Sequence, residues 1–203
     1  MSVLATAAAI GALATSPAAA QDAPLPLQCQ ASPPIASAQT FSLSAGVNVD
    51  APASVPAGST FDISIAPDPL TVPGSVSGYT VKSLSGVALA MPVPTNATLV
   101  RTTLSGGSGL GSGTPSVSVS GPNIVLSVPG PITGGSSFTL PKVTLELTAG
   151  TSGTTINTQL AGSSYSDPGL TFTASVPFLW FTISVPTTCY PSPNPVLSST
   201  AVQ

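Results

Sequence analysis

Short runs of alternating apolar and polar residues dominate the chain after position 20. In the run 60–65, alternation places Phe61, Ile63 and Ile65 on one face of an extended segment. Similar runs recur along the chain and are bounded by glycine or proline, whereas no segment after position 20 keeps a 3.6-residue period. This pattern predicts an all-β fold built as an antiparallel β-sandwich. The other predicted strands are 116–119, 123–128, 143–147, 170–176 and 179–185.

A weak internal repeat leaves two interpretations of the domain open. Residues 55–63 match residues 132–140, and both stretches place a glycine, a hydroxyl residue and a phenylalanine in the same order. One interpretation is an internally duplicated or two-lobed sandwich with halves 39–104 and 116–188. The other is that every sandwich repeats a strand, a glycine turn and a strand. The predicted domain spans 39–190, between a segment 21–38 that holds Cys29 and a Pro-rich tail 191–203.

The N-terminus predicts export. Residues 3–20 form an uncharged apolar run that ends in Ser-Pro-Ala-Ala-Ala, which is typical of a signal peptide (1–20) cleaved before Gln21. The run departs from the usual pattern because no Lys or Arg precedes it. No later stretch has the ~18 to 20 apolar residues of a membrane-spanning helix. We therefore expect a secreted or extracellular protein, with cell-wall association as an option and no transmembrane helix in the mature chain.

Two cysteines, Cys29 and Cys189, flank the predicted domain. In an exported chain an even cysteine count favours a disulfide, whereas a metal site needs three or four Cys or His ligands. We expect a Cys29–Cys189 disulfide that joins the two ends of the folded domain.

Two stretches carry a resemblance to known proteins. Pro52-x-x-Val55-x-Ala57-Gly58-x-x-Phe61 resembles the passage from the first to the second strand of secreted bacterial immunoglobulin-like domains. The composition, the signal peptide and the stretch 189–195 (Cys-Tyr-Pro-Ser-Pro-Asn-Pro) are similar to uncharacterised cell-envelope proteins of actinobacteria. The resemblance implies an immunoglobulin-like sandwich in the cell envelope and carries no functional residues with it.

Charged side chains are scarce, which narrows the function classes. The chain has no histidine, three Lys or Arg and six Asp or Glu, so 4% of its residues are charged against roughly 25% in a typical domain. Three isolated basic residues cannot neutralise a run of phosphates, so nucleic acid is excluded as a partner. They also exclude electrostatic attraction to anionic lipid. We expect no enzyme, no cofactor and no metal.

The remaining candidates for chemistry fit surface or turn positions better. Lys82 and Lys142 lack the serine of a Ser-x-x-Lys pair, and Asp62 and Glu146 fall on outward positions of predicted strands, where water solvates them. Asp68 and Asp167 stand in proline-containing turns. The glycine-rich stretch 106–113 leads into another strand instead of a helix, so it is interpreted as a loop and not as a phosphate site.

The segment Pro177-Phe-Leu-Trp-Phe-Thr-Ile183 stands out from this background. Alternation places Leu179, Phe181 and Ile183 toward the core, and Phe178 and Trp180 on the opposite face. Exposed aromatic rings can bind a sugar or the apolar surface of a partner, whereas a covering layer would make them structural. The sequence therefore predicts a non-enzymatic structural or adhesive surface protein. The alternatives are a module that binds cell-wall polysaccharide through Phe178 and Trp180, and an envelope β-barrel subunit; a second envelope protein is another partner to consider.

Overall fold

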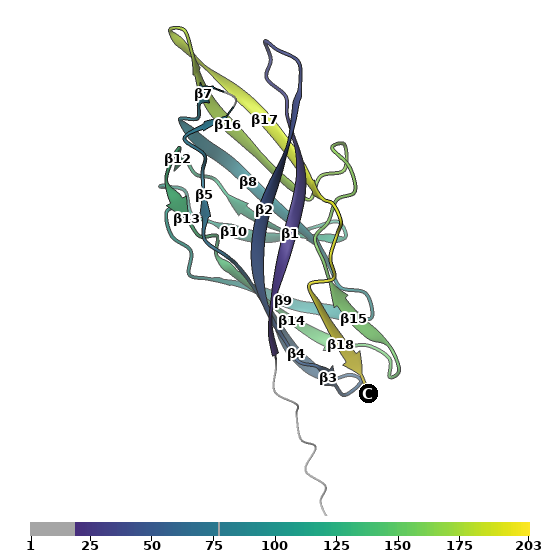
Figure 1. The fold of residues 1–203 in the computed structure, drawn as a ribbon. Helices are drawn as coiled ribbons and strands as arrows, with labels where there is room; N and C mark the ends of the chain where they lie inside the picture. Colours follow the sequence, from purple (N-terminus) through teal and green to yellow (C-terminus); the bar gives the residue numbers. More distant parts are fainter. Residues whose placement is uncertain (1–18, 77) are drawn as a thin grey trace, which may run out of the picture.

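Antiparallel strands organise the whole described chain (Figure 1). The computed structural model describes residues 19–76 and 78–203, so nearly all of the predicted signal peptide lies outside the described residues. Within these ranges the structure contains strands and no helix, which confirms the all-β antiparallel prediction. The strands are β1 (Ala19–Ala31), β2 (Gln39–Ala51), β3 (Ser54–Val55), β4 (Thr60–Pro67), β5 (Leu70–Thr71), β6 (Ser75–Val76), β7 (Tyr79–Thr80), β8 (Ser83–Pro92), β9 (Ala97–Ser105), β10 (Ser116–Ser120), β11 (Asn123–Val128), β12 (Ile132–Thr133), β13 (Ser137–Phe138), β14 (Lys142–Ala149), β15 (Thr155–Thr158), β16 (Leu170–Phe178), β17 (Phe181–Pro191) and β18 (Ser198–Val202).

One large sheet forms the body of the molecule. Its strand order is β10-β11-β8-β16-β17-β1-β2-β4-β14-β9, and β12 also pairs with β8. The end strands β10 and β9 come into contact, so the sheet rolls over and its two halves face each other across the interior. The two layers of the sandwich are therefore halves of one continuous ladder. The immunoglobulin-like assignment stays a prediction.

The interior is filled from both halves of the roll by the alternation predicted from the sequence. In β4, Ile63 and Ile65 are buried, whereas Asp62 and Ser64, at the alternate positions, point outward. In β11 the buried and half-buried positions also alternate strictly. Side chains from both halves belong to a single buried cluster, so apolar burial is the main force that closes the roll.

The predicted halves 39–104 and 116–188 are interleaved in this sheet. Strand β8 of the first half lies between β11 and β16 of the second, and β14 of the second half lies between β4 and β9 of the first. The strands of both halves therefore belong to one sheet and contribute side chains to one buried cluster.

The sequence repeat corresponds to a recurring turn. Gly58 and Gly135 have φ values of 72° and 76°, in the left-handed region where a residue without Cβ is least strained. The hydroxyl of the following residue, Ser59 or Ser136, donates to the carbonyl three residues earlier at 2.7 or 2.6 Å. Both turns link a two-residue strand to the next strand, in agreement with the interpretation that the repeat reports turn chemistry.

Both ends of the described chain take part in the fold. Strand β1 occupies the middle of the large sheet, between β17 and β2. Residues 191–203, predicted as a tail, include β18, which pairs with β15 antiparallel and with β3 parallel. Val202 packs there with Val55 and Ile156 in a second, smaller apolar cluster.

The predicted disulfide between Cys29 and Cys189 is confirmed. The two residues are direct partners in the β1–β17 ladder, and both are fully buried. Their sequence separation is 160 residues, so the bond links the first strand of the large sheet to the last strand that enters it.

Candidate functional site

The hairpin between β16 and β17 ends in an exposed apolar turn. Phe178 and Phe181 close the ladder, and Leu179 and Trp180 form the connection between them. Leu179 has a positive φ of 54°, and its side chain is 73% exposed; that of Trp180 is 88% exposed. The predicted core positions of Leu179 and Phe181 are therefore wrong. The alternation breaks because the chain reverses direction at residues 179–180.

The two phenylalanines stack across the end of the hairpin. The Phe178 and Phe181 ring centroids are 5.5 Å apart with an interplanar angle of 64°, an edge-to-face pair of the kind aromatic rings prefer. Phe178 is half-buried, whereas Phe181 is 45% exposed. This contact stabilises the turn between the two phenylalanines, so residues 178–181 form an ordered apolar tip. We call these four residues the apolar tip.

The apolar tip projects beyond the strands beside it (Figure 1). On one side, the last backbone hydrogen bond to a neighbouring segment is that of the Lys82 N–H, which donates to the Ser175 carbonyl at 2.8 Å; β7 also contacts β16. On the other side, the Ser32 N–H donates to the Pro186 carbonyl at 2.9 Å. From Ser175 to the end of β16 the hairpin advances three residues, or about 10 Å, past strand β8.

Exposed apolar side chains gather at this end of the molecule. Ile35 lies in the loop that connects β1 and β2, which starts beside Pro186 of β17. Tyr79 lies three residues before Lys82, on β7, which contacts β16. Among the described residues this end holds six of the nine large hydrophobic side chains that are exposed; the other three are scattered. The six are Ile35, Val76, Tyr79, Leu179, Trp180 and Phe181, and the three are Val100, Val119 and Val196.

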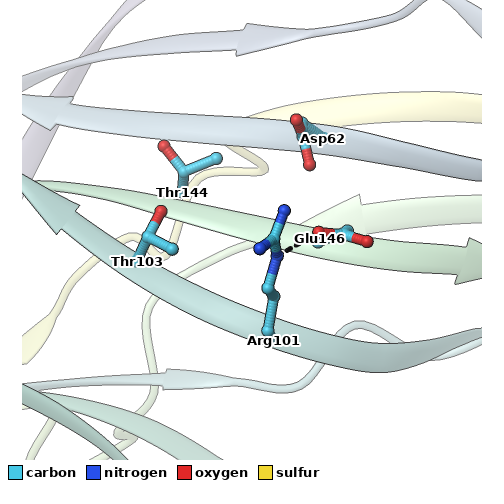
Figure 2. A pocket seen from close by; sticks show the side chains of 5 residues that line it. All are labelled: Asp62, Arg101, Thr103, Thr144 and Glu146. Atoms are coloured by element: carbon cyan, nitrogen blue, oxygen red, sulfur yellow. Dashed lines mark hydrogen bonds and ion pairs between the residues drawn. The ribbon is translucent and has the colours of Figure 1, made fainter.

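The predicted surface carboxylates lie together on the outer face of the sheet (Figure 2). Asp62 on β4 is directly opposite Glu146 on β14, which in turn faces Arg101 on β9. The Arg101 Nε donates to the Glu146 Oε2 in an ion pair, and the threonines at 103 and 144 complete a depression of about 50 Å³.

The Arg101–Glu146 ion pair is expected to contribute little to stability. The Arg101 side chain is 70% exposed and that of Glu146 is 22% exposed, so water screens their attraction. Replacing Arg101 by Gln is expected to lower the free energy of unfolding by less than about 1 kcal/mol, measured by urea denaturation. A larger loss, or one that does not shrink in high salt, would contradict a solvated surface pair.

The remaining charged candidates are separated. Lys82 precedes β8, and Lys142 begins β14 opposite Ser105. The Asp68 backbone N–H donates to the Gly46 carbonyl at 2.9 Å, and the Asp167 carboxylate accepts from the Ser163 hydroxyl at 2.8 Å inside a turn. The structure therefore joins only Asp62, Glu146 and Arg101 among the nine charged residues, on a solvated face.

The apolar tip has a recognisable signature in the sequence. Residues 178–181 are four consecutive large apolar residues, Phe-Leu-Trp-Phe. A half-buried strand alternates, so an unbroken run of this kind between two alternating strands indicates a special position. The sequence does not indicate that Ile35 and Tyr79 are exposed, because each is an isolated apolar residue in a loop or a short strand.

The comparisons with known proteins give one structural match. The chain is similar to the crystal structure of "Putative membrane anchored protein from Corynebacterium diphtheriae", with a TM-score of 0.59 and 22% sequence identity. The match covers 90% of this chain and 38% of that chain, so the present chain spans well under half of the Corynebacterium diphtheriae protein. At this identity the likeness supports the fold alone. No protein-family model matches the chain, and no curated protein matches its sequence.

The fold and the site together define an all-β protein with a solvated polar sheet face and an apolar tip at one end. Across residues 19–76 and 78–203, we find no helix with the length and apolar character needed to cross a membrane.

Proposed function

We propose that this protein is a non-catalytic component of the extracytoplasmic envelope and that the apolar tip is its contact surface. The observation that carries the proposal is the exposure of Leu179 and Trp180, at 73% and 88%, on a hairpin stabilised by the Phe178–Phe181 pair. Large apolar side chains are seldom gathered on the surface of a soluble protein unless they meet a partner.

Two observations support an extracytoplasmic location. The buried Cys29–Cys189 disulfide is of the kind that forms in oxidising compartments outside the cytoplasm. The similar protein of Corynebacterium diphtheriae is named as membrane anchored, and its organism is an actinobacterium, the group indicated by the sequence resemblance. Both agree with a signal peptide at residues 1–20.

A non-catalytic role is supported by the arrangement of the charged residues. The carboxylates that lie together, Asp62 and Glu146, share a depression of about 50 Å³ with Arg101, which neutralises Glu146. General acid–base chemistry needs a proton-transferring group that faces a bound substrate. Here the two carboxylates instead lie on a solvated sheet face, and one of them is paired with Arg101.

Binding through the apolar tip can be tested with Trp180→Ala. We expect the affinity for isolated cell-envelope material to fall about tenfold, because the variant removes a large apolar surface from the contact. Co-sedimentation of the purified protein with envelope fragments measures this. The matched control is Val119→Ala, which removes an exposed apolar side chain on β10 and is expected to leave binding unchanged.

The same experiment distinguishes the sugar-binding alternative. An indole as exposed as that of Trp180 would suit stacking on a sugar ring. In that case Trp180→Ala would abolish binding to purified, delipidated wall polysaccharide. Unchanged binding of Trp180→Ala to every envelope fraction would contradict the proposed contact surface.

A further inference from the structure

We propose that the apolar tip inserts into the interfacial layer of a lipid membrane. This inference rests on the proposed function and names the partner of the apolar tip. It combines the side chains of the tip, the distance by which it projects and the distribution of charge at this end of the molecule.

The side chains of the tip are those that favour a membrane interface. Tryptophan is enriched where lipid headgroups meet acyl chains, because its ring is apolar and its indole N–H still reaches water or headgroups. Trp180 stands at the end of the turn beside Leu179, and Phe178 and Phe181 continue the apolar surface toward the body. Trp, Phe and Leu are also the residues by which interfacial helices enter the same layer.

The projection of the tip matches the thickness of that layer. From the buried Val176 to the end of β16 at Phe178 the hairpin advances two residues, or about 7 Å, beyond the part of the strand that neighbouring segments cover. Interfacial segments bury their apolar face about 5–10 Å into the boundary between headgroups and acyl chains. The base of the hairpin is closed by buried Val176 and Val185, so insertion needs no rearrangement of the core.

A convex tip that narrows to two residues offers little area to another protein. A specific protein interface buries roughly 800 Å² on each partner. By contrast, a fluid lipid layer closes around a projection of any shape. Ile35 and Tyr79, exposed at the same end, would then meet the membrane surface around the inserted tip.

Charge is distributed so that this end can approach a membrane. Lys82, bonded through its backbone to Ser175, is the charged residue nearest the tip along the hairpin among the described residues. The acids lie elsewhere: Asp22 pairs with Asn48 well down the β1–β2 hairpin, and Asp167 precedes β16 at its far end. Insertion of the tip therefore does not bring Asp22 or Asp167 close to the lipid headgroups. One lysine gives only weak attraction, so apolar burial is the driving force.

The single tryptophan of the chain makes a direct test available. Trp180 is the sole source of indole fluorescence, so its emission reports the surroundings of the tip itself. We expect a blue shift when the full chain is mixed with phosphatidylcholine vesicles. We also expect quenching by lipids brominated on the acyl chain and protection from iodide in the buffer. An unshifted spectrum at saturating lipid would overturn the inference.

Two variants distinguish vesicle binding through the apolar tip from vesicle binding through other parts of the chain. Leu179→Ser is expected to weaken vesicle binding about tenfold, and Val119→Ser, which removes another exposed apolar side chain elsewhere on the surface, is expected to leave it unchanged. Binding through the apolar residues 3–20 would be equal in both variants and would leave Trp180 unshifted. That result would overturn the inference.

Further outcomes distinguish this inference from the proposed function. Tip-dependent binding to delipidated wall, without binding to vesicles, would overturn the lipid partner and keep the tip as a contact surface. A self-association that Leu179→Ser abolishes, again without vesicle binding, would assign the tip to a second copy and overturn the inference. Loss of tip dependence with every envelope fraction would overturn both. Thermal unfolding within about 2 °C of the parent shows that each variant is folded.

Discussion

Replacing Cys29 and Cys189 together by alanine is expected to lower the free energy of unfolding by about 2–5 kcal/mol. The disulfide closes a loop with a sequence separation of 160 residues, and removing it enlarges the conformational freedom of the unfolded chain. Both residues are fully buried at the centre of the sheet, so the variant also loses packing between β1 and β17. Urea denaturation followed by circular dichroism measures the change.

The matched control for this prediction is the parent protein under reducing conditions in denaturant. It should show the same loss as the double variant if the covalent link is what matters. A steeper dependence on urea in both cases would show that more surface is exposed in the unfolded state without the link. A difference below about 1 kcal/mol between parent and double variant would contradict this account.

Leu145→Ala is expected to destabilise the protein by about 2–5 kcal/mol. Leu145 is 1% exposed on β14, between Ile63 of β4 and Thr102 of β9, and points into the core that the rolled sheet encloses. Truncation removes apolar burial and leaves a cavity that the two flanking strands cannot close without breaking the ladder. Urea denaturation of the purified variant measures the loss.

The chain supplies a matched control in Leu179→Ala. The substitution is identical, but Leu179 is 73% exposed at the apolar tip, so its removal is expected to change the free energy of unfolding by less than about 0.5 kcal/mol. Similar losses in the two variants would contradict the assignment of Leu145 to the core or of Leu179 to the surface.

The alternation of the sequence carried most of the information about the strands. It predicted β4, β11 and β14 because their buried residues occur at every second position, as in Ile63 and Ile65. It could not predict the strand order. The position of β8 between β11 and β16 depends on contacts between segments that are distant in the sequence. The alternation within a single strand carries no information about such contacts.

The candidate site was predicted in part. Alternation continued through the turn predicts Phe178 and Trp180 as exposed and Leu179 and Phe181 as buried, whereas Phe178 is half-buried and the other three are exposed. No glycine or proline lies between Phe178 and Phe181, so the usual marker of a hairpin is missing. Leu179 takes a positive φ without being glycine, which a rule based on residue preference does not anticipate.

The central place of β1 in the sheet has a consequence for how the protein acquires its structure. Its neighbour β17 is synthesised more than 150 residues after β1, as the separation of 160 residues between Cys29 and Cys189 shows. Pairings this distant cost loop-closure entropy before they gain contacts, so folding is expected to be slow, on a scale of milliseconds to seconds. During that interval the large sheet cannot be completed. The emerging chain therefore stays incompletely folded, and during this interval its unpaired strand edges expose it most to aggregation.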